Sequence, residues 1–312
     1  MTAKKNPDVT RFNVVLLAAG RGPNDPMAQA FEAKHKCLID VAGTPMIIRV
    51  LNILRKCTSI DRIVISIESI DVLKDVPDFK KMPTKRKISI VNSEAQVSQS
   101  VLKAIEKAEL SYPILITTAD HALLTVDMLN HFCSTSAWSG YDVTLGVAHE
   151  DVVKMAYPDA KRTFFKFSDG KFSGCNMFGI MNENGLNAVK FWQQIERERK
   201  RPWRIVKAFG FGRLAIYLGG ILSLTRAMEQ ASTLMNAQIE AVRIPFAEAA
   251  IDIDKPEDLA LAEEILTRRE NKAQLINLDL AARAELEEED LEDDFEEFFD
   301  DENLAENPSE KK

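Results

Sequence analysis

The sequence has few cysteines, and they form no pattern. Four occur in 312 residues, at positions 37, 57, 133 and 175, and none belongs to a CxxC pair or to another spacing typical of metal ligands. This distribution excludes a disulfide framework and gives no support for a zinc site. We expect isolated thiols in a hydrophobic core and a reducing, cytoplasmic environment.

Long hydrophobic runs are also absent. The first apolar run, Phe12 to Ala19, is too short to cross a bilayer, and Met1 to Arg11 is too polar for a signal peptide. We therefore expect no transmembrane segment. Residues 203–228 are apolar with interspersed lysine and arginine. One interpretation is peripheral contact with a membrane or a lipid-linked ligand, and the other is a helical cover over a second site or a homodimer interface.

Basic residues are missing from one segment near the C-terminus. Residues 285–302 contain 13 acidic side chains and no basic one, and setting these aside changes the net charge from −8 to +5. We expect a disordered acidic tail over residues 285–312. The mildly basic remainder suits a small anionic ligand. It is too weakly basic, and lacks the interleaved aromatics, for a nucleic-acid partner.

What the sequence does contain is an alternation of strand-like and helix-like segments. Continuous apolar runs predict buried parallel strands, and helical spacing of apolar residues predicts the segments between them. The predicted strands are 13–18, 62–67, 88–91 and 113–118, and the predicted helices are 45–57, 95–108 and 126–132. Repeated strand and helix imply right-handed crossovers. We predict an α/β fold, a Rossmann-like three-layer αβα sandwich with a mostly parallel mixed sheet.

The pattern changes after Tyr141. Strands are predicted at 142–148, 163–167, 171–180 and 239–244, with a further one allowed at 250–253. Residues 184–235 are predicted to be helical, with breaks near Pro202 and at Gly219–Gly220, and a last helix is predicted from Pro256 to about Arg269. The mixed strands after Tyr141 suggest an extension of the sheet that carries a second binding site.

Directly after the first strand stands Leu17-Ala18-Ala19-Gly20-Arg21-Gly22. Small residues let the backbone approach a phosphate, free N–H groups in such a turn form an anion-binding nest, and Arg21 adds a charged fork of donors. The alternative is a tight turn with an incidental arginine. The motif is neither a Walker A loop nor a GxGxxG fingerprint, so P-loop and dinucleotide functions are poorly supported.

A lysine follows this loop. Lys36 precedes a short apolar stretch and a Gly-x-Pro-Met helix start at residues 43–46. A lysine at this point could reach a triphosphate and stabilise charge as the α-phosphorus is attacked. Lys34 or His35 could share that role.

Carboxylates follow the fourth strand, in Thr117-Thr118-Ala119-Asp120-His121. In open parallel sheets ligands lie beyond the carboxyl ends of the strands, and Asp120 is placed there to hold Mg²⁺, a cation that prefers carboxylate and phosphate oxygens. The alternative is a helix cap, for which Thr125 is better placed. We expect His121 to be a packing residue.

Further aspartates, Asp252 and Asp254, lie in the segment from Ala250 to Leu259. In an extended segment Asp252 and Asp254 share one face, where two carboxylates repel unless a cation or hydrogen-bond donors hold them. A bound Mg²⁺ would resolve the repulsion. The alternative is that Asp254 caps the helix beginning near Pro256. The residues alone do not decide between Asp252 and Asp254 as the ligand.

Together these motifs resemble the MobA-like nucleotidyltransferases, within the nucleotide-diphospho-sugar transferase (GT-A-like) superfamily. The family pattern of Leu-Ala-Ala-Gly-x-Gly, Lys-x-Leu and Gly-x-Pro-Met matches residues 17–22, 36–38 and 43–46, and an Asp-x-Asp-x-Pro-Glu-Asp-Leu ending matches 252–259. The chain departs from the family in lacking a second arginine after the glycines and in having a longer loop, Pro23 to Pro26, before the lysine.

The resemblance implies a Mg²⁺-dependent transfer of a nucleoside monophosphate from an NTP to a phosphorylated small-molecule acceptor, with release of pyrophosphate. Molybdopterin, a sugar phosphate, or a polyol or lipid phosphate would fit as acceptor. A GT-A-like glycosyltransferase and a non-catalytic nucleotide-binding protein are the alternatives.

The resemblance also implies roles for individual residues. Arg21 and Lys36 are the expected catalytic contacts to the NTP phosphates, and Asn176 is the expected acceptor contact. In similar enzymes the region of Ser93 and Ser98 meets the base and ribose, although Ser98 could be an ordinary helix residue. The expected nucleotide-binding residues are Leu17, Ala18, Ala19, Gly20, Arg21, Gly22, Lys36, Ser93, Ser98 and Asp120, and the expected metal ligands are Asp120, Asp252 and Asp254.

The expected domain layout follows. Residues 1–270 form the nucleotidyltransferase domain, with an NTP-binding part at about 12–135, an acceptor part at about 136–250, and a metal motif and closing helix at 250–270. A linker or helix at 271–284 precedes the acidic tail.

Overall fold

The computed structural model describes residues 10–20, 22–82, 88–198 and 219–278. The chain divides into two compact units, Met1–Ala262 and Glu263–Lys312. The first contains the sheet and the candidate site. The described part of the second, residues 263–278, is helical.

The first unit is built on one mixed sheet in which β9 runs in the direction opposite to the other described strands. The strand order is β10-β7-β9-β6-β1-β4-β5, and β8 pairs with β9 outside this path. β9 is antiparallel to β6, β7 and β8, whereas the other pairs in the sheet are parallel. The strands are β1 (Phe12–Leu17), β4 (Ile60–Ile67), β5 (Ile88–Asn92), β6 (Ile114–Thr118), β7 (Val143–His149), β8 (Phe165–Phe167), β9 (Gly170–Ile180) and β10 (Ile239–Arg243). A separate hairpin pairs β2 (Asp40–Val41) with β3 (Thr44–Pro45).

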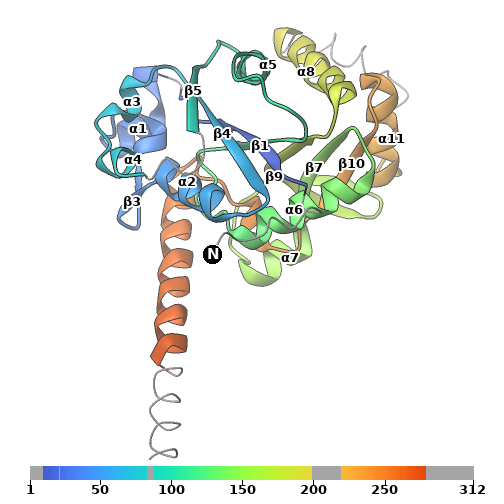
Figure 1. Cartoon of the computed structure of the whole chain (residues 1–312). Coiled ribbons are helices and arrows are strands. Elements are labelled where there is room, and N and C mark those ends of the chain that lie inside the picture. The colour runs from blue at the N-terminus through green and yellow to red at the C-terminus, as the bar shows by residue number, and fades with distance from the viewer. Residues whose placement is uncertain (1–9, 21, 83–87, 199–218, 279–312) are drawn as a thin grey trace, which may run out of the picture. The chain divides into compact units, whose positions relative to one another are not determined.

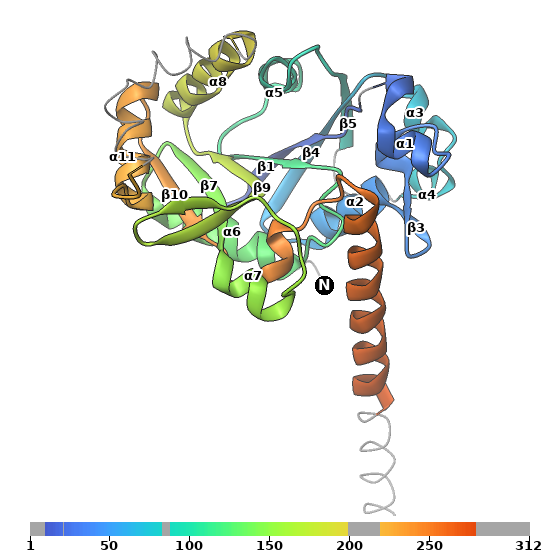
Figure 2. The ribbon, with the colours of Figure 1, turned by 180° about the vertical axis from the view of Figure 1, so that it is seen from behind.

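Helices cover both faces of the sheet, as Figures 1 and 2 show from opposite sides. One face carries α5 (Val97–Lys107) and α8 (Leu186–Glu198), and the other carries α2 (Met46–Lys56), α6 (Val126–Ser139) and α7 (Glu150–Ala156). The remaining described helices of this unit are α1 (Pro26–Ala30), α3 (Asp71–Lys74), α4 (Pro77–Lys80), α11 (Leu224–Met235) and the short 3-10 turns η1 (Gly22–Asn24), η2 (Lys36–Leu38), η3 (Glu183–Gly185) and η4 (Ala247–Ala250).

The alternation of side chains along β1 explains the three layers. Val14 and Leu16 join the core beneath α2 and α6, while Val15 joins a second core with Val101 of α5. A strand buried on both faces must be apolar throughout, which is why the run at residues 13–18 predicts it. The predicted α/β sandwich with a mostly parallel mixed sheet is confirmed.

Some predicted boundaries were wrong. Residues 250–253 form no strand, because the 3-10 turn η4 ends at Ala250 and residues 251–254 are irregular. Helix α6 continues past Phe132 to Ser139, where Gly140 ends it in a left-handed conformation (φ 73°). The last helix continues past Arg269 to residue 278.

Two other predictions fall largely outside the described residues. Most of the apolar segment 203–228 and all of the acidic tail 285–312 lie there, so neither expectation is tested. Among the residues that are described, no helix is long and apolar enough to cross a membrane.

Candidate functional site

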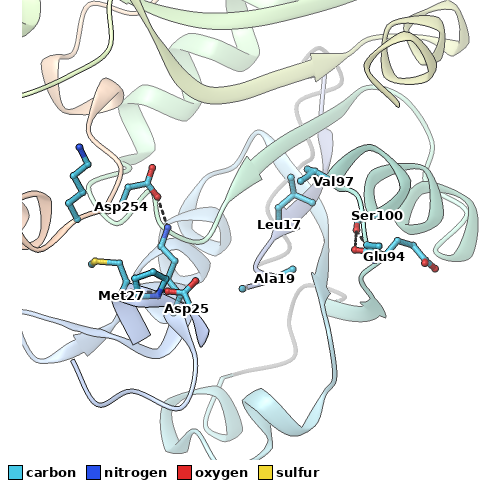
Figure 3. A pocket seen from close by; sticks show the side chains of 13 residues that line it. Leu17, Ala19, Asp25, Met27, Glu94, Val97, Ser100 and Asp254 are labelled. Carbon is cyan, nitrogen blue, oxygen red and sulfur yellow. Dashed lines mark hydrogen bonds and ion pairs between the residues drawn. The ribbon is translucent and has the colours of Figure 1, made fainter. Parts of the chain in front are cut away.

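A pocket of about 550 Å³ opens at the carboxyl ends of the parallel strands. In Figure 3, Leu17 and Ala19 lie at its centre, with Asp25 and Met27 of the α1 region on one side. The start of α5 and the preceding loop form the other side, with Asp254 and Lys36 completing the wall. This is the edge at which open parallel sheets bind ligands.

The segment that begins at Leu17 and contains Gly20, called the glycine loop below, lies against this pocket. Its backbone donors are not all free. The N–H of Ala18 donates to the carbonyl of Ser66 at 2.9 Å, and that of Gly20 donates to Oε1 of Glu68 at 2.6 Å. The expectation that free amides of this turn form a nest is therefore wrong for these two residues. Arg21 lies outside the described residues.

The long loop after the glycines is occupied by a short helix. Asp25 is buried and caps α1, its Oδ1 accepting the N–H groups of Met27 at 3.0 Å and Ala28 at 3.2 Å. The departure from the family pattern is thus an inserted helical turn whose residues line the pocket.

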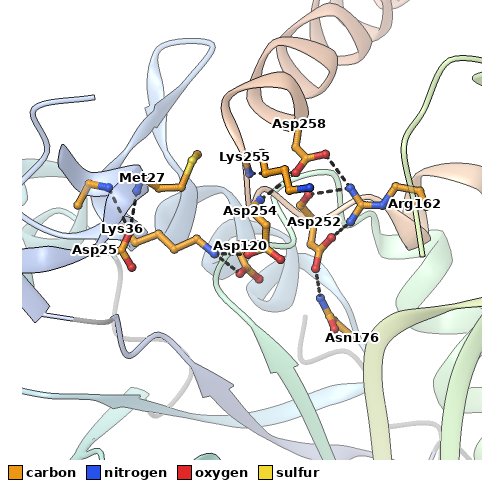
Figure 4. A network of polar contacts seen from close by, with 11 residues as sticks. Asp25, Met27, Lys36, Asp120, Arg162, Asn176, Asp252, Asp254, Lys255 and Asp258 are labelled. Carbon is orange, nitrogen blue, oxygen red and sulfur yellow. Dashed lines mark hydrogen bonds and ion pairs between the residues drawn. The ribbon is translucent and has the colours of Figure 1, made fainter. Parts of the chain in front are cut away.

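Lys36 occupies the centre of the polar network in Figure 4. Its Nζ lies 2.7 Å from Oδ2 of Asp120 and 2.6 Å from Oδ1 of Asp254, and its side chain is only 17% exposed. Burial lowers the pKa of Lys36, but the charge of Asp120 and hydrogen bonds to both carboxylates outweigh it, so the pKa is raised and the ammonium stays charged. Lys34 is exposed, and the His35 ring contacts Glu68 instead.

Asp120 follows β6 and contacts Lys36, which lines the pocket, although Asp120 is not itself a lining residue. Its carbonyl accepts the N–H of Ile253 at 3.1 Å, which ties the segment at 251–254 to the end of β6. Its Oδ1 is buried without a hydrogen-bond partner in the part of the chain that the structure describes. The alternative role of a helix cap is wrong, because Thr125 caps α6 by accepting the N–H of Met128 at 3.2 Å.

His121 is a packing residue, as predicted. It is 1% exposed, and burial lowers its pKa to about 4, although the charge of Asp120 acts in the opposite direction. The ring is therefore neutral near pH 7.

The two aspartates near the C-terminal end of the unit have different partners. Asp252 contacts the guanidinium of Arg162 through Oδ1, and its Oδ2 accepts a hydrogen bond from Nδ2 of Asn176 at 3.0 Å. Asp254 instead contacts Lys36. The structure therefore engages Asp252 with donors and directs Asp254 to the pocket, a distinction that the residues alone left open.

The alternative that Asp254 caps the last helix is wrong, because Asp258 provides the cap. Oδ2 of Asp258 accepts the N–H groups of Asp254 at 3.2 Å and Lys255 at 3.0 Å, whereas the side chain of Asp254 contacts Lys36. An acid three residues into the helix satisfies amides that have no acceptor within the helix. Ile251 and Ile253, which alternate with the two aspartates, are fully buried.

Sequence reasoning missed Arg162. This side chain is 11% exposed, and its Nη1 lies 2.8 Å from Oδ1 of Asp258 while the guanidinium also contacts Asp252. Arg162 lies in an irregular segment between α7 and β8, where no motif or periodicity marks it. It neutralises the two aspartates that do not contact Lys36.

The residues predicted to contact the acceptor and the ribose have partners within the chain, and their roles toward a ligand stay predictions. Asn176 adopts a left-handed backbone conformation (φ 49°) and its side chain binds Asp252. Ser98 is fully buried, and both its N–H and its hydroxyl donate to Oε2 of Glu196 on α8. Ser93 follows β5 and donates its N–H to the carbonyl of Ile67 at 2.8 Å. Neither serine is among the described residues that line the pocket, whereas Glu94 and Ser100 are.

The two hydrogen bonds from Ser98 to Glu196 predict that Glu196 contributes to stability. Glu196→Ala should lower the free energy of unfolding by about 1–3 kcal/mol, because it leaves two buried donors of Ser98 without their acceptor. Urea unfolding measures this, and Glu196→Gln, which keeps one acceptor oxygen, should lose less. A change in nucleotide affinity without a change in stability would instead favour the predicted ribose contact.

The carboxylates do not form a closed metal cage. In the described ranges, no group of three or more His, Cys, Asp or Glu side chains is arranged to hold a metal ion. Mg²⁺ in nucleotide sites is commonly bound by one or two carboxylates together with substrate phosphates and water. Asp120 and Asp254 match that smaller donor set.

The open, mostly parallel sheet thus brings a lysine and carboxylates to the edge at which α/β folds bind their ligands. Residues 14–168 match the family model described as the MobA-like NTP transferase domain. This stretch belongs to that family.

Similar proteins agree with this placement. A bifunctional enzyme IspD/IspF from Desulfotalea psychrophila is 24% identical over 266 residues, covering 85% of this chain, and this chain spans 59% of that relative's length. A hypothetical transferase from Thermus thermophilus superposes with a TM-score of 0.66 at 21% identity, over 80% of this chain and 100% of the other. A 4-diphosphocytidyl-2C-methyl-D-erythritol synthase from Anaerococcus prevotii gives 0.52 at 13% identity, over 83% and 100%. The two structures support the fold.

Proposed function

We propose that the protein transfers a nucleoside monophosphate from an NTP to a phosphorylated small-molecule acceptor and releases pyrophosphate. The observation that carries this proposal is the position of Lys36, whose ammonium lies between Asp120 and Asp254 at a pocket bordered by the glycine loop. A cation fixed beside two carboxylates is suited to the negative charge of a triphosphate that arrives with a metal ion.

The proposed reaction does not require the protein to deprotonate the acceptor. An oxygen of the acceptor phosphate attacks the α-phosphorus, a new P–O bond forms, and the bond to the pyrophosphate leaving group breaks. A phosphate monoester is already anionic near neutral pH, so the reaction needs no strong general base. The protein acts by positioning and by stabilising charge, and Lys36 is the described side chain best placed to do so.

Mg²⁺ fits the residues present. Oδ1 of Asp120 is buried with no hydrogen-bond partner in the described residues, and Asp254 extends to the same point from another segment. These two residues would hold the ion, which would supply charge neutralisation to the triphosphate. Asp252 is engaged by Arg162 and Asn176, and we assign it to positioning the segment that carries Asp254.

A pyrophosphate-release screen tests the function. The four NTPs would be incubated with MgCl₂ and a panel of acceptors that includes molybdopterin, sugar phosphates, polyol phosphates and lipid phosphates. Release that needs both an NTP and one acceptor is expected. Transfer of a sugar from a sugar nucleotide, without pyrophosphate release, would instead identify a glycosyltransferase, and NTP binding with no turnover of any acceptor would contradict catalysis.

A further inference from the structure

Glu68 joins two parts of the site that are distant in the sequence. It follows β4, and its Oε1 accepts the N–H of Gly20 at 2.6 Å. Its Oε2 lies 3.0 Å from Nε2 of His35, the residue that precedes Lys36. One carboxylate therefore links the glycine loop to the segment that carries the lysine.

The proton on His35 can be assigned from its other contact. The N–H of Cys37 donates to Nδ1 of His35 at 3.2 Å, which requires a lone pair on that nitrogen. The neutral ring then carries its proton on Nε2 and donates it to Glu68. Sγ of Cys37 also lies 3.1 Å from Nδ1 of His35. Burial, and to a lesser degree the charge of Glu68, raises the pKa of this thiol to about 12, so no thiolate draws the ring proton to Nδ1.

Gly20 lies unusually close to this ring. A Cβ added at Gly20 would lie 3.0 Å from Nε2 of His35, a distance that would force the ring to shift. The absence of a side chain thus lets the loop lie against the buried ring while its amide reaches Glu68. The loop is held by a carboxylate and a ring together.

We propose that Glu68 is a positioning residue for the nucleotide, fixing the glycine loop relative to Lys36 through the Gly20 amide and His35. The inference rests on the proposed function for the identity of the ligand. The opposite role would be a placeholder that occupies the loop amide until a phosphate displaces it. The contact between His35 and Oε2 of Glu68 favours the positioning role. His35 is only 8% exposed, so if the carboxylate moved away, the buried Nε2–H of His35 would lose its acceptor.

Three variants separate these roles: Glu68→Ala, Glu68→Gln and, as a control, Glu106→Ala, which removes an exposed carboxylate from α5. Calorimetry with each NTP and MgCl₂ gives the dissociation constant, and pyrophosphate release gives kcat and KM. Glu68→Ala should raise Kd and KM about tenfold with a smaller change in kcat, because the loss is in positioning. Glu68→Gln keeps an oxygen for the Gly20 amide but turns an NH₂ group to the His35 donor, so it should recover only part of the affinity. An unchanged or lower Kd in Glu68→Ala overturns the proposal.

A measurement without nucleotide keeps this test apart from that of the function. Hydrogen exchange at the Gly20 amide, followed by NMR, should be at least about tenfold faster in Glu68→Ala and unchanged in the control, with similar thermal midpoints. If the wild-type protein binds none of the four NTPs, the proposed function fails, yet exchange still reports whether Glu68 fixes the loop. Unchanged exchange at Gly20 contradicts the inference in either case.

Discussion

Asp120→Asn is expected to reduce pyrophosphate release by about 10³-fold while the protein stays folded. The wild-type carboxylate contacts Lys36 with one oxygen, and its second oxygen is buried with no hydrogen-bond partner among the described residues. An amide keeps the size of the side chain and loses the charge that a divalent cation and the lysine both require. The measurement is kcat/KM for the NTP at saturating acceptor across a range of MgCl₂ concentrations.

The matched control is Asp127→Asn. Asp127 is an exposed acid in the first turn of α6, seven positions further along the chain, and it should keep activity within about twofold because surface substitutions rarely act at a distance. A thermal midpoint near that of the wild type would show that the loss in Asp120→Asn is not unfolding. Full activity of Asp120→Asn at limiting MgCl₂ would remove Asp120 from the metal site.

The sequence was sufficient for the fold because the strands that build it are buried on both faces. β1 alternates between two cores, so every residue of Asn13 to Leu16 must be apolar or satisfied, and the run can be recognised without knowing its neighbours. The same holds for the position of the site, since parallel strands bring their carboxyl ends to one edge. Lys36, Asp120 and Asp254 were therefore predictable as members of one region.

The contacts that divide labour within the site were not predictable. Arg162 and Asp252 are separated by 90 positions, and Gly20 and Glu68 by 48. Asp252 and Gly20 lie in recognisable motifs, but no motif or periodicity marks their partners Arg162 and Glu68. Residues 250–253 have the composition of a strand, but the 3-10 turn η4 precedes them and they add no strand to the sheet. A hydrogen bond from Ile253 to Asp120 holds that segment instead. The composition of a segment indicates that its residues are buried, but it does not indicate which residues they contact.

Lys36→Met should affect both catalysis and the response to Mg²⁺. The loss of the ammonium is expected to lower kcat by about 10²–10³-fold, the range for removing one donor that stabilises developing charge. It also leaves Asp120 and Asp254 facing each other without a cation, which should cost about 1–2 kcal/mol of stability. That figure is below the range for a fully buried pair because Asp254 is 58% exposed.

The two effects together distinguish a catalytic lysine from a structural one. Lys36 contacts the two carboxylates to which we assign Mg²⁺, and under that proposal the ammonium and the cation compete for them. Removal of Lys36 should then make the thermal midpoint rise more steeply with MgCl₂ than in the wild type. Lys34→Met, which removes an exposed lysine two positions away, should change neither kcat nor that response. If Lys36→Met lost stability, kept its kcat and showed no added response to Mg²⁺, the lysine would only be neutralising acids, and the charge stabilisation would fall to side chains outside this cluster.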